Sequence, residues 1–445
     1  VDAIDKQSGS TLTLGGSGTA VTLACGATQS GFGRSGSVNW QTTPKTATFT
    51  AVNGEGYFIN SGSAITANLP AGSAGAIVAF SDYARNFATY NLSITPNGSE
   101  KIGGVAATAK LNVNGQAATF VYVDATKGWV NVQNAEDTEV GASFITATGG
   151  TITTSGNCKI HTFTGPGTFE VTSVAAAAVN NEVSYVVVAG GAGGGGSPGT
   201  GDSGGGGGAG GFRETKSPVT PYTASPLDGQ PSAPNRITVT QTSFPIQVGG
   251  GGTPGAGSGG RGGTGTNSIF STITAAGGGA GGSFNIPNPY AGGDGGSGGG
   301  GSGGNSGSAP GGNGNQPPVT PSQGNNGGAA STSPLNWWGG GGGGAGAAGT
   351  TAYAKSQVGN GGNGVTTEIT ASPVAYAGGG GGGQTPGRAP PSDWSGGGQG
   401  GTGGGARYNL SGTANTGGGA GGGSGPCGAG GTGGSGIVII RYKFQ

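Results

Sequence analysis

The side chains that most often do chemistry in proteins are few and scattered in this sequence. The single His, His161, lies in an alternating run with Lys159 and Phe163, so we predict that it is a strand side chain. One imidazole without a nearby Cys or carboxylate cluster makes neither a metal site nor a catalytic triad. We therefore expect His161 to have a structural role.

The carboxylates and glycine patterns give no better evidence of catalysis. Asp82, Glu100 and Asp124 stand isolated in segments rich in Thr and Asn, and no pair resembles the acid and base of a glycosidase. Patterns such as GxGxxG occur many times, but none lies between a strand and a predicted helix, and no GxxxxGK[ST] is present. We therefore expect no enzymatic activity, no cofactor and no metal site.

The three cysteines, Cys25, Cys158 and Cys427, are far apart and form no CxxC motif. This spacing excludes the usual zinc and redox motifs, and an odd number of cysteines cannot all pair within one chain. We expect free, buried thiols, because unpaired Cys behaves as a small hydrophobic residue. One intramolecular disulfide or a bridge between subunits remains an alternative.

Composition excludes two classes of partner. Lys and Arg number 17, as do Asp and Glu, and charged residues make up 8% of the 445 residues. No net positive field is available to hold nucleic-acid phosphates. No apolar run reaches 18 residues, so we expect no insertion into a membrane.

Glycine divides the chain into two parts. Of the 114 Gly residues, 24 lie in residues 1–189 and the remaining 90 lie in residues 190–445. The first part has short runs rich in Thr, Val and aromatic residues at a spacing of roughly ten residues, which favours a β-sandwich or small barrel. We expect hairpin turns at Asn97-Gly98 and Asn114-Gly115. The predicted strands are 46–52, 56–60, 65–70, 76–81, 91–96, 109–113, 118–124 and 129–132.

A second, smaller β unit straddles the boundary. Its predicted strands are 159–164, 168–174, 184–189, 236–241, 244–248 and 437–444, and we expect their sheet to frame the glycine-rich tract at both ends. The fold class is then all-β, with essentially no α-helix. The predicted domains are an attachment or shaft segment at 1–35, a β module at 36–150, and a glycine-rich domain at 151–445, with framing strands in 158–190, 236–249 and 437–444.

Disorder is the usual fate of a tract in which about one residue in three is Gly. Here, however, Gly runs recur between segments of turn or strand character, such as 284–290, 316–323 and 384–394. Polyglycine II helices fit this pattern, because they have three residues per turn and no internal hydrogen bonds, and without Cβ atoms they pack side by side. We predict a bundle of such rods, with reversals at its two ends. Collagen is excluded, because Gly does not occupy every third position.

The glycine-rich part of the sequence and the strands beside it resemble a known family. Residues 158–445 resemble the glycine-rich domains at the ends of phage tail-fibre and adhesin proteins, through 159–169 (KIHTFTGPGTF), 185–191 (YVVVAGG), 210–214 (GGFRE) and 433–442 (GGSGIVIIRY). Residues 39–129 are similar to β modules in structural proteins of marine phages, notably at 69–72 (LPAG) and 94–102 (ITPNGSEKI). In tail-tip adhesins of T-even-like phages, a polyglycine II bundle presents variable loops to a host receptor. The resemblance implies that role, a virion location, other virion or tail proteins as partners, and a bacterial surface glycan or outer-membrane protein as receptor.

Large side chains between the glycine rods are the candidate receptor-binding residues. Exposed rings stack on sugars or dock into protein receptors, whereas buried rings would instead cap the ends of the glycine lattice, and both interpretations stay open. Arg388 and Asp393 could add orienting hydrogen bonds beside Trp394. The candidates are Tyr290, Trp337, Trp338, Arg388, Asp393, Trp394 and Tyr408.

The function that we expect is a phage tail-fibre or adhesin protein that recognises a host-cell receptor through the loops of the bundle. The β modules would build or attach a shaft as a homo-oligomer, with a trimer considered first, and several copies would add weak contacts by avidity. One alternative is a non-catalytic structural fibre or extracellular filament protein without a specific receptor. An ice-binding protein is a further alternative, although a regular three-residue pattern without β modules would suit it better.

Overall fold

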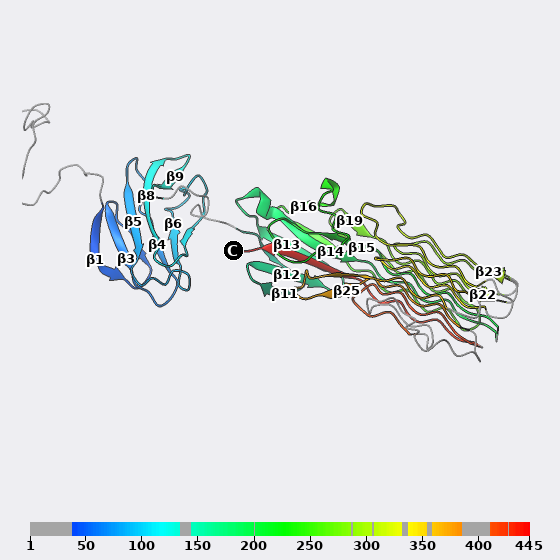
Figure 1. Cartoon of the computed structure of the whole chain (residues 1–445). Coiled ribbons are helices and arrows are strands. Elements are labelled where there is room, and N and C mark those ends of the chain that lie inside the picture. Colours follow the sequence, from blue (N-terminus) through cyan, green and yellow to red (C-terminus); the bar gives the residue numbers. More distant parts are fainter. Residues whose placement is uncertain are drawn as a thin grey trace, which may run out of the picture. The chain divides into compact units, whose positions relative to one another are not determined.

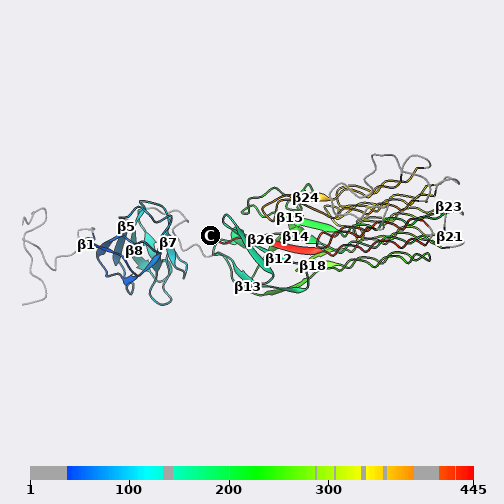
Figure 2. The ribbon, with the colours of Figure 1, turned by 90° about the horizontal axis from the view of Figure 1, so that it is seen from below.

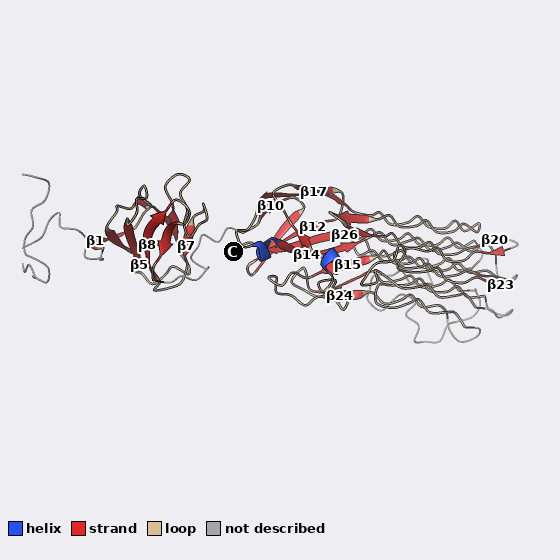
Figure 3. Ribbon diagram, turned by 90° about the horizontal axis from the view of Figure 1, so that it is seen from above, coloured by secondary structure: helices blue, strands red, loops and turns tan. Residues whose placement is uncertain are grey.

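A computed structural model describes residues 38–133 and 144–445, apart from 200, 286–287, 305–306, 332–336, 354–357, 385–409 and 426. Contacts divide the chain into two compact units, Val1–Gly141 and Ala142–Gln445. Within the described residues helical structure is confined to the 3-10 turns η2 (Ala178–Asn181) and η3 (Ala233–Asn235), and the fold is all-β (Figure 3). No helix in that part of the chain has the length and hydropathy that crossing a membrane would take.

The first unit is a sandwich of two sheets. The five-stranded sheet has the order β1 (Asn39–Lys45), β3 (Glu55–Ile59), β5 (Ile77–Asp82), β8 (Ala117–Asp124) and β9 (Gly128–Asn131). The four-stranded sheet has the order β2 (Phe49–Thr50), β4 (Ile65–Asn68), β6 (Leu92–Thr95) and β7 (Ala109–Leu111). Tyr57, Phe80, Phe120 and Trp129 are buried between the sheets.

Successive strands of this unit alternate between the two sheets, from β1 through β6. Each strand therefore lies parallel to the strand two places later in the chain: β1 with β3, β3 with β5, β2 with β4 and β4 with β6. The remaining pairs, β5–β8, β8–β9 and β6–β7, are antiparallel. The sandwich predicted from the strand spacing is thus built with parallel neighbours.

Three local predictions for this unit are wrong. The strand predicted at 46–52 is only the two-residue β2, and β1, which precedes it, was not predicted. Asn114-Gly115 joins β7 to β8, which belong to different sheets, so it makes a turn but no hairpin. Asn97-Gly98 opens a long connection between the paired strands β6 and β7. Gly98 and Gly115 do have positive φ angles, of 55° and 81°, so the local turn signal was sound.

The second unit has two larger sheets (Figure 1). The first runs in the order β10 (Thr146–Thr148), β13 (Gly167–Ser173), β17 (Ser243–Gln247), β18 (Ser268–Phe270) and β19 (Ile273–Ala275). The second runs β11 (Thr151–Ser155), β12 (Cys158–Phe163), β26 (Ile437–Lys443), β14 (Glu182–Val188) and β15 (Phe212–Thr215), with β16 (Ile237–Thr238) also paired to β14. We call these two sheets the frame.

The frame gathers both sequence ends of the glycine-rich tract at one end of the bundle. The last strand, β26, lies between β12 and β14 and is antiparallel to both. Tyr185, Val187, Phe270 and Tyr442 are buried between the two sheets of the frame. The predicted strand at 236–241 is reduced to the two residues of β16.

Glycine-rich rods continue directly from the frame strands (Figure 2). Residues 189–197 follow β14 outward, 204–211 return to β15, and the last rod leads back into β26. Short hairpins lie within the tract: β20 (Phe284–Asn285) with β21 (Asn288–Pro289), β22 (Gly303–Gly304) with β23 (Gly307–Ser308), and β24 (Val365–Thr367) with β25 (Val374–Tyr376).

The backbone of residues 190–197 has a threefold hydrogen-bond pattern. The amides of Gly190, Gly193 and Gly196 donate to residues 266, 263 and 260 of one neighbouring rod. The amides of 191, 194 and 197 donate to 434, 431 and 428 of a second rod, and those of 192 and 195 donate to 208 and 205 of a third. Each residue thus faces a different neighbour from the residue before it, as in a polyglycine II helix.

Three further rods donate to the same segment. The carbonyls of Gly191 and Gly194 accept from residues 252 and 255, those of 190 and 193 from 278 and 281, and those of 192 and 195 from 420 and 423. A Cβ on Gly194 would overlap the carbonyl oxygen of Gly421. A rod with six neighbours therefore leaves no space for most side chains, which is why the interior of the bundle is Gly with occasional Ala.

Rods at the perimeter lack an outer neighbour, and polar side chains take its place. The hydroxyl of Thr266 accepts from the amide of Gly250 at 2.8 Å, and the side chain of Asn267 accepts from Gly277 at 2.9 Å. Asn326 accepts from Gly314 at 2.8 Å, and Thr350 accepts from Asn360 at 2.7 Å. These side chains satisfy backbone groups that would otherwise be open to another rod.

A candidate binding surface at the distal end of the glycine-rich bundle

The connections between rods at the end remote from the frame form one surface, which we call the distal end (Figure 1). Ser203 forms bridges with both Gly303 and Ser424, and Ser197 with Gly428. Main-chain hydrogen bonds of this kind fix the loops to the rods and to one another. The distal end comprises the described residues of 197–203, 256–261, 283–291, 302–309, 331–338, 353–358 and 424–428.

Tyr290, a predicted site residue, is displayed at this end with 43% of its surface exposed. Its backbone amide donates to the carbonyl of Ser283 at 3.0 Å and to the hydroxyl of Ser302 at 3.1 Å. The hydroxyl of Ser302, which is buried, also lies 2.8 Å from the carbonyl of Ser283. The backbone that carries the exposed ring is therefore held by the lattice.

Arg261 lies beside this loop and was not singled out from the sequence. It is exposed, and its guanidinium donates to the carbonyl of Ala291 at 3.0 Å. Ala291 directly follows Tyr290, and a guanidinium has five N–H donors, of which this bond uses one. In the sequence Arg261 is a single charged residue within a glycine-rich stretch, and only the packing of the rods shows that it lies beside the loop of Tyr290.

Trp337 and Trp338 occupy different environments despite being adjacent. Trp337 is half-buried, and its carbonyl accepts from the hydroxyl of Ser203. Trp338 is only 3% exposed and packs with Ala352 and Val358. Its indole N–H has no hydrogen-bond partner in the described structure. Trp338 thus covers the end of the lattice, which is the capping role that the sequence left open for these rings.

Tyr353 is a distal ring that sequence analysis missed. It follows Ala352 of the Trp338 cluster and is 61% exposed. In the sequence it is one Tyr after a Gly-Thr-Thr-Ala stretch, a pattern that many Tyr residues near strand ends share, so nothing marked it as exposed. The described part of the distal end therefore displays Tyr290, Tyr353 and Arg261, with Trp337 partly covered.

Four predicted site residues, Arg388, Asp393, Trp394 and Tyr408, lie outside the described residues. The described residues that flank them belong to the same bundle. The amide of Gln384 donates to the hydroxyl of Ser424 at 3.0 Å, and the carbonyl of Leu410 accepts from Gly421.

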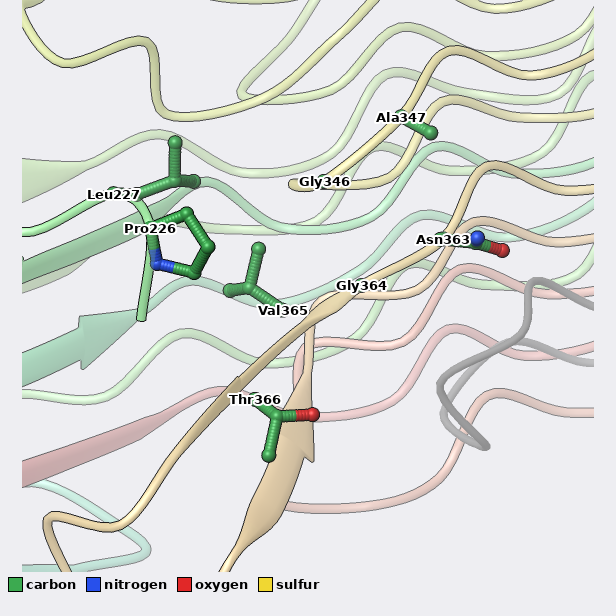
Figure 4. A pocket seen from close by; sticks show the side chains of 8 residues that line it. All are labelled: Pro226, Leu227, Gly346, Ala347, Asn363, Gly364, Val365 and Thr366. Atoms are coloured by element: carbon green, nitrogen blue, oxygen red, sulfur yellow. The ribbon is translucent and has the colours of Figure 1, made fainter. Parts of the chain in front are cut away.

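A second candidate is an open recess of about 430 Å³ near the frame (Figure 4). Pro226 and Leu227 lie on one side of it, opposite Val365, and Asn363 and Thr366 complete the lining with backbone of residues 346, 347 and 364. None of these lining residues titrates near neutral pH. The recess offers apolar contact without groups that could orient a ligand strongly.

Buried charged side chains near this recess hold loops on the frame. Glu214 accepts from the amide of Ser225 at 2.9 Å and from the hydroxyl of Thr367 at 2.6 Å, and burial raises the pKa of its carboxyl. Arg441 donates to the carbonyls of Ile369 at 3.1 Å and Pro221 at 2.9 Å. Both residues therefore attach covering segments to strands β15 and β26.

The remaining reactive residues are dispersed. His161 is a buried side chain of β12, as its alternating pattern predicted, with Nδ1 2.7 Å from the carbonyl of Gly149 and Nε2 3.1 Å from the hydroxyl of Tyr442. Cys158 is a free, buried thiol, whereas Cys427 is free and exposed, so the prediction of burial is wrong for Cys427. Cys25 lies outside the described residues. Where the structure describes the chain, no group of three His, Cys, Asp or Glu residues could hold a metal ion.

Comparison with known proteins identifies the second unit. A family model described as a glycine-rich domain matches residues 162–443, which run from the end of β12 through the rods to the end of β26. No curated protein matches the chain. Since the matched residues make up more than half of the sequence, the chain belongs to the glycine-rich domain family.

Proposed function

We propose that this chain is a non-enzymatic adhesin of a virion, a tail fibre or related appendage, that recognises a receptor on the surface of a bacterial host. The observation that carries the proposal is the distal end. There Tyr290 and Arg261 are displayed beside loops that hydrogen bonds join to the lattice, and Tyr353 is also exposed. Rings and guanidinium groups dominate the energetics of recognition surfaces, and a rigid support lowers the entropy lost on binding.

The receptor class that fits is a surface glycan or an outer-membrane protein. Exposed rings supply flat apolar faces for either one, and Arg261 supplies donors for hydroxyl or carboxylate oxygens. Trp337, Arg388, Asp393, Trp394 and Tyr408 remain proposed contributors. We expect a homo-oligomer, a trimer first, because several copies of a weak site raise the overall affinity.

The perimeter of the bundle favours this proposal over a fibre made by lateral growth of the lattice. Thr266, Asn267, Asn326 and Thr350 bond to backbone groups that an additional rod would need. A bundle capped on its sides has little means of adding rods from another molecule. Display at the end is thus better supported than assembly through the sides.

The test is binding of the labelled full chain to a panel of bacterial strains. The variants are Tyr290→Ala and Arg261→Ala, with Thr264→Ala, an exposed residue on the same rod as Arg261, as the matched control. Saturable binding to a narrow set of strains, weakened by the first two changes and unaltered by the third, is expected. A folded protein that binds no strain would overturn the proposal.

A further inference from the structure

The outer face of the five-stranded sheet in the first unit carries a row of aromatic side chains. Trp40 on β1, Phe58 on β3 and Tyr83, directly after β5, come from three neighbouring strands (Figure 1). Tyr57, Ile59 and Phe80, at the alternate positions, are buried in the core. Because strand side chains alternate, the row faces away from the core. Trp40 is 40% exposed and Tyr83 is 61% exposed.

The three rings contact one another in order. The centroids of Trp40 and Phe58 are 4.9 Å apart with an interplanar angle of 28°, and those of Phe58 and Tyr83 are 6.3 Å apart at 68°. The indole of Trp40 is therefore stacked on Phe58 and covers part of that ring, whereas Tyr83 meets Phe58 edge to face. We call Trp40, Phe58 and Tyr83 the aromatic row.

A glycine allows Trp40 to lie against the sheet. Trp40 is the register partner of Gly56 on β3, and a Cβ at Gly56 would come within 2.8 Å of the indole carbons Cδ2 and Cε3. The indole thus rests on the backbone of β3 and is stacked on Phe58, which fixes its position before any ligand arrives. Such pre-ordering is typical of a binding surface rather than of a scattered exposed ring.

The outward strand positions beside the row are uncharged, and the exposed Arg85 follows in the turn after Tyr83. The outward strand positions beside it carry small hydroxyl groups at Thr42, Ser81 and Thr119, and aliphatic groups at Ile77, Val121 and Val130. None of these outward positions holds Asp, Glu, Lys or Arg. The other sheet faces outward with Thr66, Asn68, Ser93 and Lys110 and has no such row. A neutral ligand matches this face, because it brings no charge to be desolvated without a partner.

We propose that the aromatic row is a binding site for a neutral polysaccharide made of pyranose units. A pyranose ring has a flat C–H face that packs on aromatic rings, and its equatorial hydroxyl groups point sideways toward partners such as Thr42 and Ser81. The two exposed rings, Trp40 and Tyr83, contact Phe58 from different strands, so the row suits consecutive units of a chain rather than a single sugar. The site is separate from the distal end, and it does not rest on the function proposed there.

Native gel electrophoresis of the full chain through gels that contain a neutral polysaccharide tests the proposal. The probes are laminarin, xyloglucan, galactomannan and dextran, with the polyanion alginate for comparison. The variants are Trp40→Ala with Tyr83→Ala, each single change, and Trp40→Tyr, which keeps an aromatic ring. Tyr90→Ala is the matched control, because Tyr90 lies in the same unit, is 39% exposed and is not part of the row.

We expect at least one neutral polysaccharide to retard the chain, with affinity lowered at least about tenfold in the double variant, or about 1.4 kcal/mol. Trp40→Tyr should keep most of the affinity, and Tyr90→Ala all of it. Retardation by none of the neutral probes, or equal retardation of every variant, would overturn the proposal. The proposal would also be overturned if the wild-type chain self-associates in sedimentation experiments and the double variant stays monomeric, since a second copy would then cover this face. If the double variant does not fold, the single change at the well-exposed Tyr83 gives the same test.

Discussion

The backbone amide of Tyr290 donates a hydrogen bond to the hydroxyl of Ser302 at 3.1 Å, and that hydroxyl is itself buried in the lattice. The loop that displays the ring and the end of a neighbouring rod are therefore joined. A loop attached in this way loses little further freedom when its ring meets a partner. The glycine lattice thus acts as a rigid base for side chains that it does not contain.

The interior of the lattice should not tolerate a methyl group. In Gly194→Ala the new Cβ would overlap the carbonyl oxygen of Gly421, which is backbone and cannot rotate away. We expect a loss of about 3 kcal/mol or more in the stability of the second unit. In Gly250→Ala the nearest atom would be the Thr266 hydroxyl oxygen at 3.9 Å, so the change should stay within about 0.5 kcal/mol. Scanning calorimetry of both variants checks the difference, and equal melting temperatures would contradict the packing described here.

The junction between frame and rods depends on a buried hydroxyl. Ser268 donates to the carbonyl of Val188 at 2.7 Å and accepts from the amide of Gly249 at 2.9 Å. Ser268→Ala removes both bonds in a buried site and should cost about 1–3 kcal/mol. The exposed Ser258→Ala serves as the control and should be close to neutral. Denaturant titration of the two variants measures the contrast, and a neutral Ser268→Ala would show that the junction does not need this hydroxyl.

His161 should make the stability of the second unit depend on pH. Burial lowers the pKa of its imidazole below the ordinary value of 6.5, and the neutral ring is satisfied between Gly149 and Tyr442. As the pH falls through 6.5, His161 takes up a proton in the unfolded chain but stays neutral in the folded protein. The contribution of His161 to the stability of the second unit is therefore complete above pH 6.5 and is lost as the pH falls below it.

His161→Gln tests this effect, since an amide can donate to the Gly149 carbonyl and accept from the Tyr442 hydroxyl without titrating. Melting temperatures measured between about pH 8 and about pH 5.5 should fall more steeply for the wild-type protein than for the variant. Glu214, whose raised pKa acts in the opposite direction, is present in both proteins and cancels in the comparison. Parallel curves would contradict the prediction.

Substitutions of Trp338 and Tyr353 should distinguish a ring that covers the end of the lattice from a ring that is displayed to solvent. Trp338→Ala removes a buried ring from the cluster with Ala352 and Val358 and should cost about 3–5 kcal/mol. Tyr353→Ala removes a ring that is mostly in solvent and should leave the melting temperature nearly unchanged. Thermal melts of the two variants distinguish these roles. A destabilised Tyr353→Ala with a neutral Trp338→Ala would reverse the assignment.

The sequence predicted the parts of the fold that depend on local pattern. Runs of β-branched residues marked β12, β14 and β26, and the glycine runs marked the rods. The parallel pairing of β1 with β3 and β5 could not be predicted, because pairing depends on distant segments that local propensity does not describe. Strand β1 itself was missed, since its polar sequence includes Pro44 and it lies at a sheet edge.

The candidate site was predicted in part for the same reason. Tyr290 stood out as a large ring between glycine runs, and the structure displays it. Trp338 had the same signal but is buried, because its exposure depends on Ala352 and Val358 from two other segments of the tract. Arg261 reaches the site only through its contact with Ala291, 30 residues away in the chain. Contacts between rods decide which side chains are displayed, and a single sequence does not contain that register.

Binding of the labelled full chain to bacterial strains tests the central claim most directly. We expect saturable binding to a narrow set of strains, reduced about tenfold or more by the combined Tyr290→Ala and Arg261→Ala changes, with the melting temperature unchanged. Thr264→Ala should bind as the wild-type protein does. Absence of binding to every strain, or undiminished binding of the combined variant, would contradict recognition through the distal end.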